Sequence, residues 1–79
     1  MPLRSSPRQI PLRAVRSSSI AAAGYDRDEE TFRVRFIRGD AYDYLHVPPD
    51  VFQNFLDAPS KGRFINWRVK PNFPYRRVS

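Results

Sequence analysis

The sequence has 79 residues, no cysteine and a formal net charge of +6 at pH 7. A chain this short forms at most one domain with a thin core, and without cysteine it has neither disulfide bonds nor thiolate metal sites. No apolar run approaches the roughly 18 residues that a membrane-spanning helix needs. We therefore expect a cytoplasmic protein without membrane association, with an Arg- and Ser-rich transit peptide over residues 1–16 as the minor alternative.

The basic residues are concentrated at the two ends of the chain. Residues 1–16 carry a net charge of +4, residues 17–60 one of −4 and residues 61–79 one of +6. Twelve of the fourteen basic residues are arginine, whose guanidinium group both forks onto phosphate and stacks on aromatic rings. This distribution suits a polyanionic partner; a charge that only keeps the protein dispersed is an equal alternative.

The first residues differ in composition from the rest of the chain. Residues 1–16 contain three prolines and four arginines but few large apolar side chains. Such a segment cannot bury enough apolar surface to offset the entropy lost on ordering. We therefore predict a flexible basic arm over residues 1–16 and a single domain over residues 17–79. Within the domain, residues 20–25 suit a short strand and the acidic residues 26–30 suit a turn.

The stretch FRVRFIRGDAYDYLHV, residues 32–47, predicts a β-hairpin. Residues 32–38 alternate apolar and basic side chains, which is the period of a half-buried strand, and residues 42–47 supply its partner. Gly39 and Asp40 between them suit a two-residue type II′ loop.

The length of that loop decides which side chains share a face. With two loop residues, Arg35 faces Tyr44, and Arg33, Arg35, Tyr42 and Tyr44 all lie on one face, opposite an apolar one. A three-residue loop shifts the pairing by one residue, puts Phe36 beside Tyr44 and buries the tyrosines. We favour the two-residue loop, which leaves the tyrosines and arginines on an open face.

The sequence after the hairpin predicts a helix. Prolines at residues 48 and 49 and an acidic residue after them suit a first helical turn, and the apolar residues of 49–57 fall on one stripe that can pack on the sheet. Residues 61–70 are ambiguous, because their apolar residues alternate as in a strand while Ser60 suits the cap of a short helix. The predicted fold is α+β: a three-stranded antiparallel meander with one packed helix and, in one reading, a second short helix.

The order of these segments resembles the KTSC domain, a short module found alone in bacterial and phage proteins and at the C-terminus of some lysyl-tRNA synthetases. The resemblance spans about residues 15 to 79. It is carried by Ser18 and Ile20, Gly24-Tyr25-Asp26, Val34 and Phe36, Gly39, Tyr42 and Tyr44, Val47-Pro48, Ala58 and Ser60, Gly62, Phe64 and Asn66, and Pro74. The resemblance implies a helix in residues 61–70 and suggests RNA binding.

Basic and aromatic residues in the hairpin and in residues 61–79 predict a nucleic-acid-binding surface. Exposed rings stack on unpaired bases, while arginine and lysine hold the phosphates. The alternative is structural, because tyrosine and arginine are also ordinary half-buried strand residues. The predicted binding residues are Arg33, Arg35, Tyr42, Tyr44, Lys61, Arg63, Trp67, Arg68, Lys70, Arg76 and Arg77.

No spacing in the sequence predicts paired acid and base groups, a phosphate-binding glycine loop or a metal site. We therefore expect a non-catalytic module, without cofactor or metal, that binds RNA or another nucleic acid. The alternative is a protein–protein interaction module that docks through its aromatic tail or through the edge of its first strand. The sequence leaves the oligomeric state open.

Overall fold

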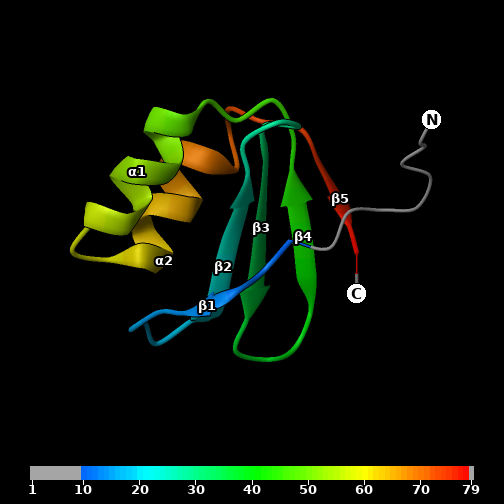
Figure 1. Ribbon diagram of the computed structural model, residues 1–79. Coiled ribbons are helices and arrows are strands. Elements are labelled where there is room, and N and C mark those ends of the chain that lie inside the picture. Colours follow the sequence, from blue (N-terminus) through cyan, green and yellow to red (C-terminus); the bar gives the residue numbers. More distant parts are fainter. Residues whose placement is uncertain (1–9, 79) are drawn as a thin grey trace.

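The structure, a computed structural model, describes residues 10–78. It is a five-stranded antiparallel sheet in the order β1-β2-β3-β4-β5, with its helical segments packed on one face (Figure 1). The elements are β1 (Arg13–Ala14), β2 (Ile20–Asp26), β3 (Thr31–Phe36), β4 (Ala41–Tyr44), α1 (Pro49–Asp57), α2 (Lys61–Phe64), η1 (Ile65–Val69) and β5 (Tyr75–Arg77). The α+β class is confirmed, but the predicted three-stranded meander lacks the two edge strands β1 and β5, which are too short to show a period.

The segment before the predicted domain boundary is part of the fold. β1 pairs with β2 at Ala22 and Ala23, and Ile10 is 7% exposed. Gly24 permits this packing, because a Cβ atom at that position would lie 2.2 Å from the carbonyl oxygen of Pro11. Residues 10–16 therefore belong to the folded domain rather than to the predicted arm, whose other residues, 1–9, lie outside the described part of the chain.

The β3–β4 hairpin has a register different from the favoured one. Its loop has three residues, 37–39, because the amide of Phe36 donates to the carbonyl of Asp40 at 2.9 Å, and Gly39 closes the turn with a φ of +111°. The positive φ explains why glycine is needed there. Across the hairpin, Arg33 pairs with Asp43 and Phe32 with Tyr44.

This register reverses the predicted faces. The observed pairing differs from the favoured one by three residues, since Arg35 pairs with Ala41 instead of Tyr44, and a shift by an odd number of residues moves every side chain of a strand to the other face of the sheet. The predicted pairing of Arg35 with Tyr44 is therefore wrong, as is the common face of these arginines and tyrosines. The three-residue alternative gives the correct loop length and the correct face for the tyrosines, but Tyr44 lies opposite Phe32 and not beside Phe36.

The helical segments follow their local signals. The predicted helix over residues 49–57 is confirmed by α1, which has proline at its start and Asp50 in its first turn. Ser60 accepts a hydrogen bond from the amide of Arg63 and caps α2. The chain continues into the π-helical turns of η1, where the amide of Lys70 donates to the carbonyl of Ile65 at 2.8 Å. The helical reading of residues 61–70 is thus confirmed.

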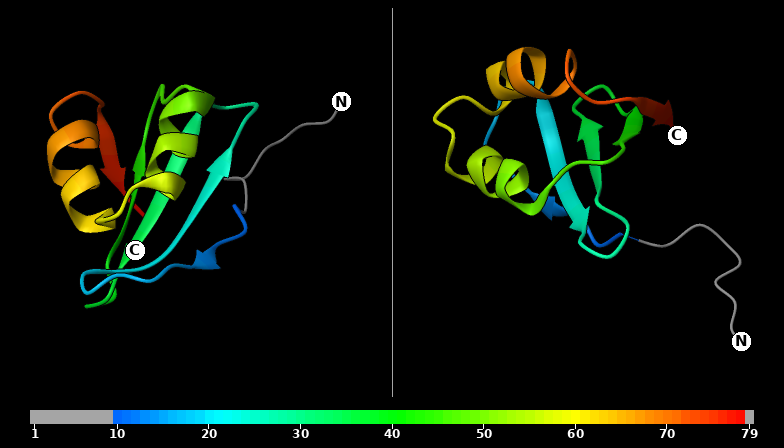
Figure 2. Two further views of the ribbon diagram at one scale, coloured as in Figure 1. Left: turned by 90° about the vertical axis from the view of Figure 1, so that its left-hand side faces the viewer. Right: turned by 90° about the horizontal axis from the view of Figure 1, so that it is seen from above.

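The core lies between one face of the sheet and the helical segments, as the two views of Figure 2 show. Phe32 is fully buried there, with its ring centroid 5.0 Å from that of Phe55 on α1. Ile65 and Val69 seal the core from η1. We call this side the helix face and the opposite side the back face. Because partners across a strand pair share a face, Tyr42, Tyr44, Tyr75 and Arg77 all lie on the helix face.

Candidate nucleic-acid interface

Three hollows that share lining residues lie around the tip of the β3–β4 hairpin, with volumes of about 500, 380 and 220 Å³, and Arg38 lines all three. The 380 Å³ hollow extends to the α2–η1 segment, and together the three form a groove. We call it the hairpin–helix groove. Its defining residues are Phe36, Arg38, Tyr42, Tyr44, Lys70, Tyr75 and Arg77.

Four aromatic side chains line the groove. The ring of Tyr42 meets Phe36 and Tyr75 in edge-to-face contacts, with centroids 6.0 and 5.6 Å apart. Tyr44 lies beneath Tyr75, is only 2% exposed and has its phenol pKa raised to about 12 by burial. Tyr75 is 61% exposed. The solvent exposure of the rings therefore increases from Tyr44, which is buried, to Tyr75, which is open to solvent.

Three cations border these rings, with one carboxylate among them. The Nζ atom of Lys70 lies 5.7 Å from the ring centroid of Phe36, and the guanidinium carbon of Arg77 lies 6.0 Å from that of Tyr42. Both distances are within the range of cation–π attraction. The remaining pair is Arg38 and Asp40, which are joined by two hydrogen bonds of 2.9 and 3.2 Å.

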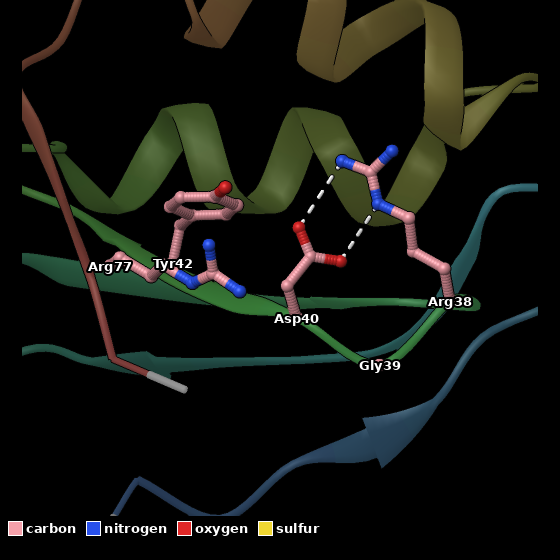
Figure 3. Close-up of a pocket in the computed structure, with 5 residues that line it drawn as sticks. All are labelled: Arg38, Gly39, Asp40, Tyr42 and Arg77. Carbon is pink, nitrogen blue, oxygen red and sulfur yellow. Dashed lines mark hydrogen bonds and ion pairs between the residues drawn. The ribbon is translucent and has the colours of Figure 1, made fainter.

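The Arg38–Asp40 pair changes the electrostatics of the groove. The hydrogen bond from Arg38 lowers the pKa of the Asp40 carboxyl, which in turn raises the pKa of Arg38. Figure 3 shows Tyr42 and Arg77 together at one end of the hollow, with the joined pair at the other. The Asp40 carboxylate that lines the first hollow is matched by Arg38, and Lys70 and Arg77 are further basic residues among those that line the described hollows.

Three of the predicted binding arginines lie on the back face instead. Arg33 donates to both carboxylate oxygens of Asp43, at 2.7 and 3.0 Å, and Arg76 approaches the same carboxylate at 3.7 Å. The hydrogen bond with Asp43 raises the pKa of Arg33. Arg35 donates to the carbonyl of Gly39 at 3.1 Å. These arginines are separated from the tyrosines by the thickness of the sheet, which corrects the predicted arrangement.

The other predicted residues divide between structural contacts and exposed helix surface. Lys61 donates to the carbonyls of Leu56 and Ala58, at 3.1 and 2.7 Å, and so caps the end of α1. Arg63, Trp67 and Arg68 are exposed on α2 and η1, outside the hollows described above, and Trp67 is 77% exposed. Of the eleven predicted residues, Tyr42, Tyr44, Lys70 and Arg77 line the groove.

The sequence-based site missed Phe36, Arg38 and Tyr75. Phe36 looked like a core residue of the alternating strand, and Arg38 looked like part of a turn. Tyr75 lies in a tail that pairs with β4 over only three residues, which is too short for the sequence to show the alternation of a strand. The length of the hairpin loop was the signal that could have placed Phe36 on the face of Tyr42 and Tyr44, whereas no local signal places Tyr75.

The structure of residues 10–78 contains no helix long and apolar enough to cross a bilayer. In the same part of the chain, no group of three or more His, Asp or Glu side chains is placed to hold a metal ion.

This chain is similar to proteins of a known domain family. The family model described as the KTSC domain matches residues 16–73. A protein of Tsukamurella paurometabola is 50% identical over 62 residues, covering 78% of this chain and 92% of the relative. A lysine–tRNA ligase of Nostoc punctiforme is 33% identical over 70 residues, covering 89% of this chain but 12% of the ligase.

A solved structure has the same fold. The crystal structure of a KTSC domain protein from Yersinia pestis superposes with a TM-score of 0.83 at 38% identity, covering 90% of this chain and all of that protein.

Proposed function

The chain belongs to the KTSC domain family, and from that premise we propose that it is a non-catalytic module that binds nucleic acid in the hairpin–helix groove. One observation carries the proposal: the groove combines four aromatic rings with three cations, and its carboxylate is already matched by Arg38. Rings that stack on bases and cations that hold phosphates are the two components of single-strand recognition.

The family relationship supports the same function. Segments related to this chain form 12% of proteins named lysine–tRNA ligase, and that name states a tRNA substrate. A small module attached to such an enzyme is well placed to contact RNA. Binding of RNA by this chain is our proposal, with the hairpin–helix groove as the binding surface.

The proposal is tested by titrating the full chain with labelled single-stranded RNA, tRNA and single-stranded DNA at about 50 and about 200 mM salt. Phosphate contacts release counterions, so the affinity should fall steeply as the salt concentration rises. The informative pair of variants is Lys70→Ala, in the groove, and Arg68→Ala, an exposed cation two residues away. Lys70→Ala should weaken binding several-fold and lower the salt slope by about one, whereas Arg68→Ala should have a smaller effect.

The basic residues near the start of the chain need their own control. An Arg4→Ala/Arg8→Ala double variant removes two of those charges without changing the length of the chain. If this variant abolishes binding and Lys70→Ala does not, the groove is not the site. Absence of binding to all three probes at low salt would reject the proposal.

The second candidate function is protein–protein interaction through β5. In the sheet of residues 10–78, β5 pairs with β4 on one side only, so an extended peptide could add as a further strand. The arginines of β5 would favour an acidic peptide. Failure of the titration with nucleic acid would make this candidate the leading one.

A further inference from the structure

The 220 Å³ hollow at the inner end of the groove differs from the other two in its lining. Its walls are Phe36, Tyr42, Tyr44, Tyr75, Arg38 and Lys70. Four of these six side chains are aromatic, and the two others are cations. The lining thus combines flat apolar surfaces with positive charge at the rim and contains no carboxylate.

The ring geometry leaves aromatic surface available in this hollow. Tyr42 contacts Tyr75 at 80° and Phe36 at 71°, so these rings meet edge to face rather than covering each other's faces. Tyr75, on β5, is 61% exposed, while Tyr44 below it is sealed. A planar group that enters the hollow can therefore lie against Tyr75 while Tyr42 and Tyr44 form the floor.

The positions of the cations specify what is attached to that planar group. Lys70 lies over Phe36 and lines this hollow, whereas Arg77 lies over Tyr42 and lines the neighbouring 500 Å³ hollow. A ligand that satisfies the hollow therefore has a flat ring with an anion beside it. A nucleotide of a polynucleotide chain has this chemistry, because each base is attached to a backbone that carries a phosphate.

Resting on the proposed function, we propose that this hollow receives one unpaired base, with a neighbouring phosphate held by Lys70. The site consequently selects single strands of RNA or DNA over duplex. A base in a duplex is stacked on both faces and paired, and it would have to leave the stack to reach Tyr75, which is less favourable for a paired base than for an unpaired one. A preference for single strands over duplex distinguishes this proposal from general attraction to phosphate, because both forms carry phosphates.

The test compares three probes at one low salt concentration: a labelled oligonucleotide of about ten residues, its duplex, and the same strand with abasic sites throughout. RNA and DNA versions of each probe distinguish the two sources of the base. The native chain should bind the single strand at least about tenfold more tightly than the duplex or the abasic strand, because each stacked base contributes roughly that much.

Three variants assign the discrimination to the hollow. Tyr75→Ala should remove most of the preference for the single strand. Because Tyr75 is exposed, the substitution should leave the fold intact, which circular dichroism checks. Tyr75→Phe keeps the ring and should keep the preference. Trp67→Ala removes a more exposed ring outside the hollow and is the matched control.

The outcomes separate the two proposals. Equal affinity for single strand, duplex and abasic strand, together with weaker binding by Lys70→Ala, would overturn the base site and leave the proposed function standing. The same holds if Tyr75→Ala keeps the full preference for single strands. No binding of any probe would overturn both.

Discussion

Arg33 and Asp43 face each other across the β3–β4 hairpin, and two hydrogen bonds of 2.7 and 3.0 Å join them on the back face of the sheet. The Asp43 side chain is 1% exposed and that of Arg33 is 19% exposed. In the register favoured from the sequence, with a two-residue loop, Asp43 would lie opposite Phe36 on the core face. A buried carboxylate without a partner is costly, so this ion pair fixes which residues face the groove.

Removal of Arg33 should destabilise the protein strongly. Arg33→Ala leaves the buried Asp43 carboxylate with only Arg76, at 3.7 Å, and is expected to lower the free energy of unfolding by about 3 kcal/mol. Arg35→Ala, on the same strand and face, removes one exposed hydrogen bond and should cost less than about 1 kcal/mol. Urea unfolding measures both. Equal losses for the two variants would show that the ion pair does not set the register.

Gly24→Ala should displace the first described residues from the sheet. The added methyl group would lie 2.2 Å from the carbonyl oxygen of Pro11, and backbone cannot move aside as a side chain can. We expect a loss of about 1–3 kcal/mol in the free energy of unfolding and faster amide exchange around Leu12.

Gly62→Ala is the matched control for that substitution. Its methyl group would meet only the Ser19 hydroxyl, which can rotate away, and alanine favours a helix over glycine by about 1 kcal/mol. This variant should be at least as stable as the native chain. Native amide exchange in Gly24→Ala would contradict the close approach of Pro11 to the sheet.

Lys61 is expected to contribute to the stability of the fold rather than to binding. Its ammonium group donates to two carbonyls at the end of α1, so Lys61→Ala should lower the free energy of unfolding by about 1 kcal/mol. Arg63→Ala removes a nearby exposed charge and should leave stability almost unchanged. Thermal unfolding and nucleic-acid titration of both variants separate the two roles. If Lys61→Ala reduces affinity far more than Arg63→Ala at unchanged stability, Lys61 belongs to the binding surface.

The buried phenol of Tyr44 should make stability depend on alkaline pH. Burial raises the pKa of Tyr44 from 10.0 to about 12, so the folded protein holds this proton more tightly than the unfolded chain. The resulting stabilisation is complete below pH 10 and is lost as the pH rises from 10 to 12, by roughly 2–3 kcal/mol in total.

Tyr44→Phe keeps the ring, lacks the ionisable group and is the reference for this measurement. Between pH 10 and 12, the free energy of unfolding should fall more for the native chain than for Tyr44→Phe. Parallel pH profiles for the two proteins would show that the Tyr44 phenol is not sealed in the native state.

Much of the architecture follows from local chemistry. The alternation of Phe32, Val34 and Phe36 with arginine predicts a strand, and the proline–acid start at Pro49 predicts α1, because each signal acts within a few residues. The edge strands β1 and β5 escape prediction because two or three residues cannot show a period. Their positions depend on the backbone of β2 and β4, which no local pattern contains.

The amino-acid sequence by itself determined the α+β class, the central hairpin, the helix of residues 49–57 and the excess of basic side chains at both ends. Only the tertiary structure decided which side of the sheet the tyrosines occupy. That choice depends on a third loop residue and on a salt bridge between strands, and a shift in pairing by an odd number of residues, here three, exchanges the two faces of a strand. Candidate binding residues therefore came from the sequence, while their grouping into a groove came from the packed sheet.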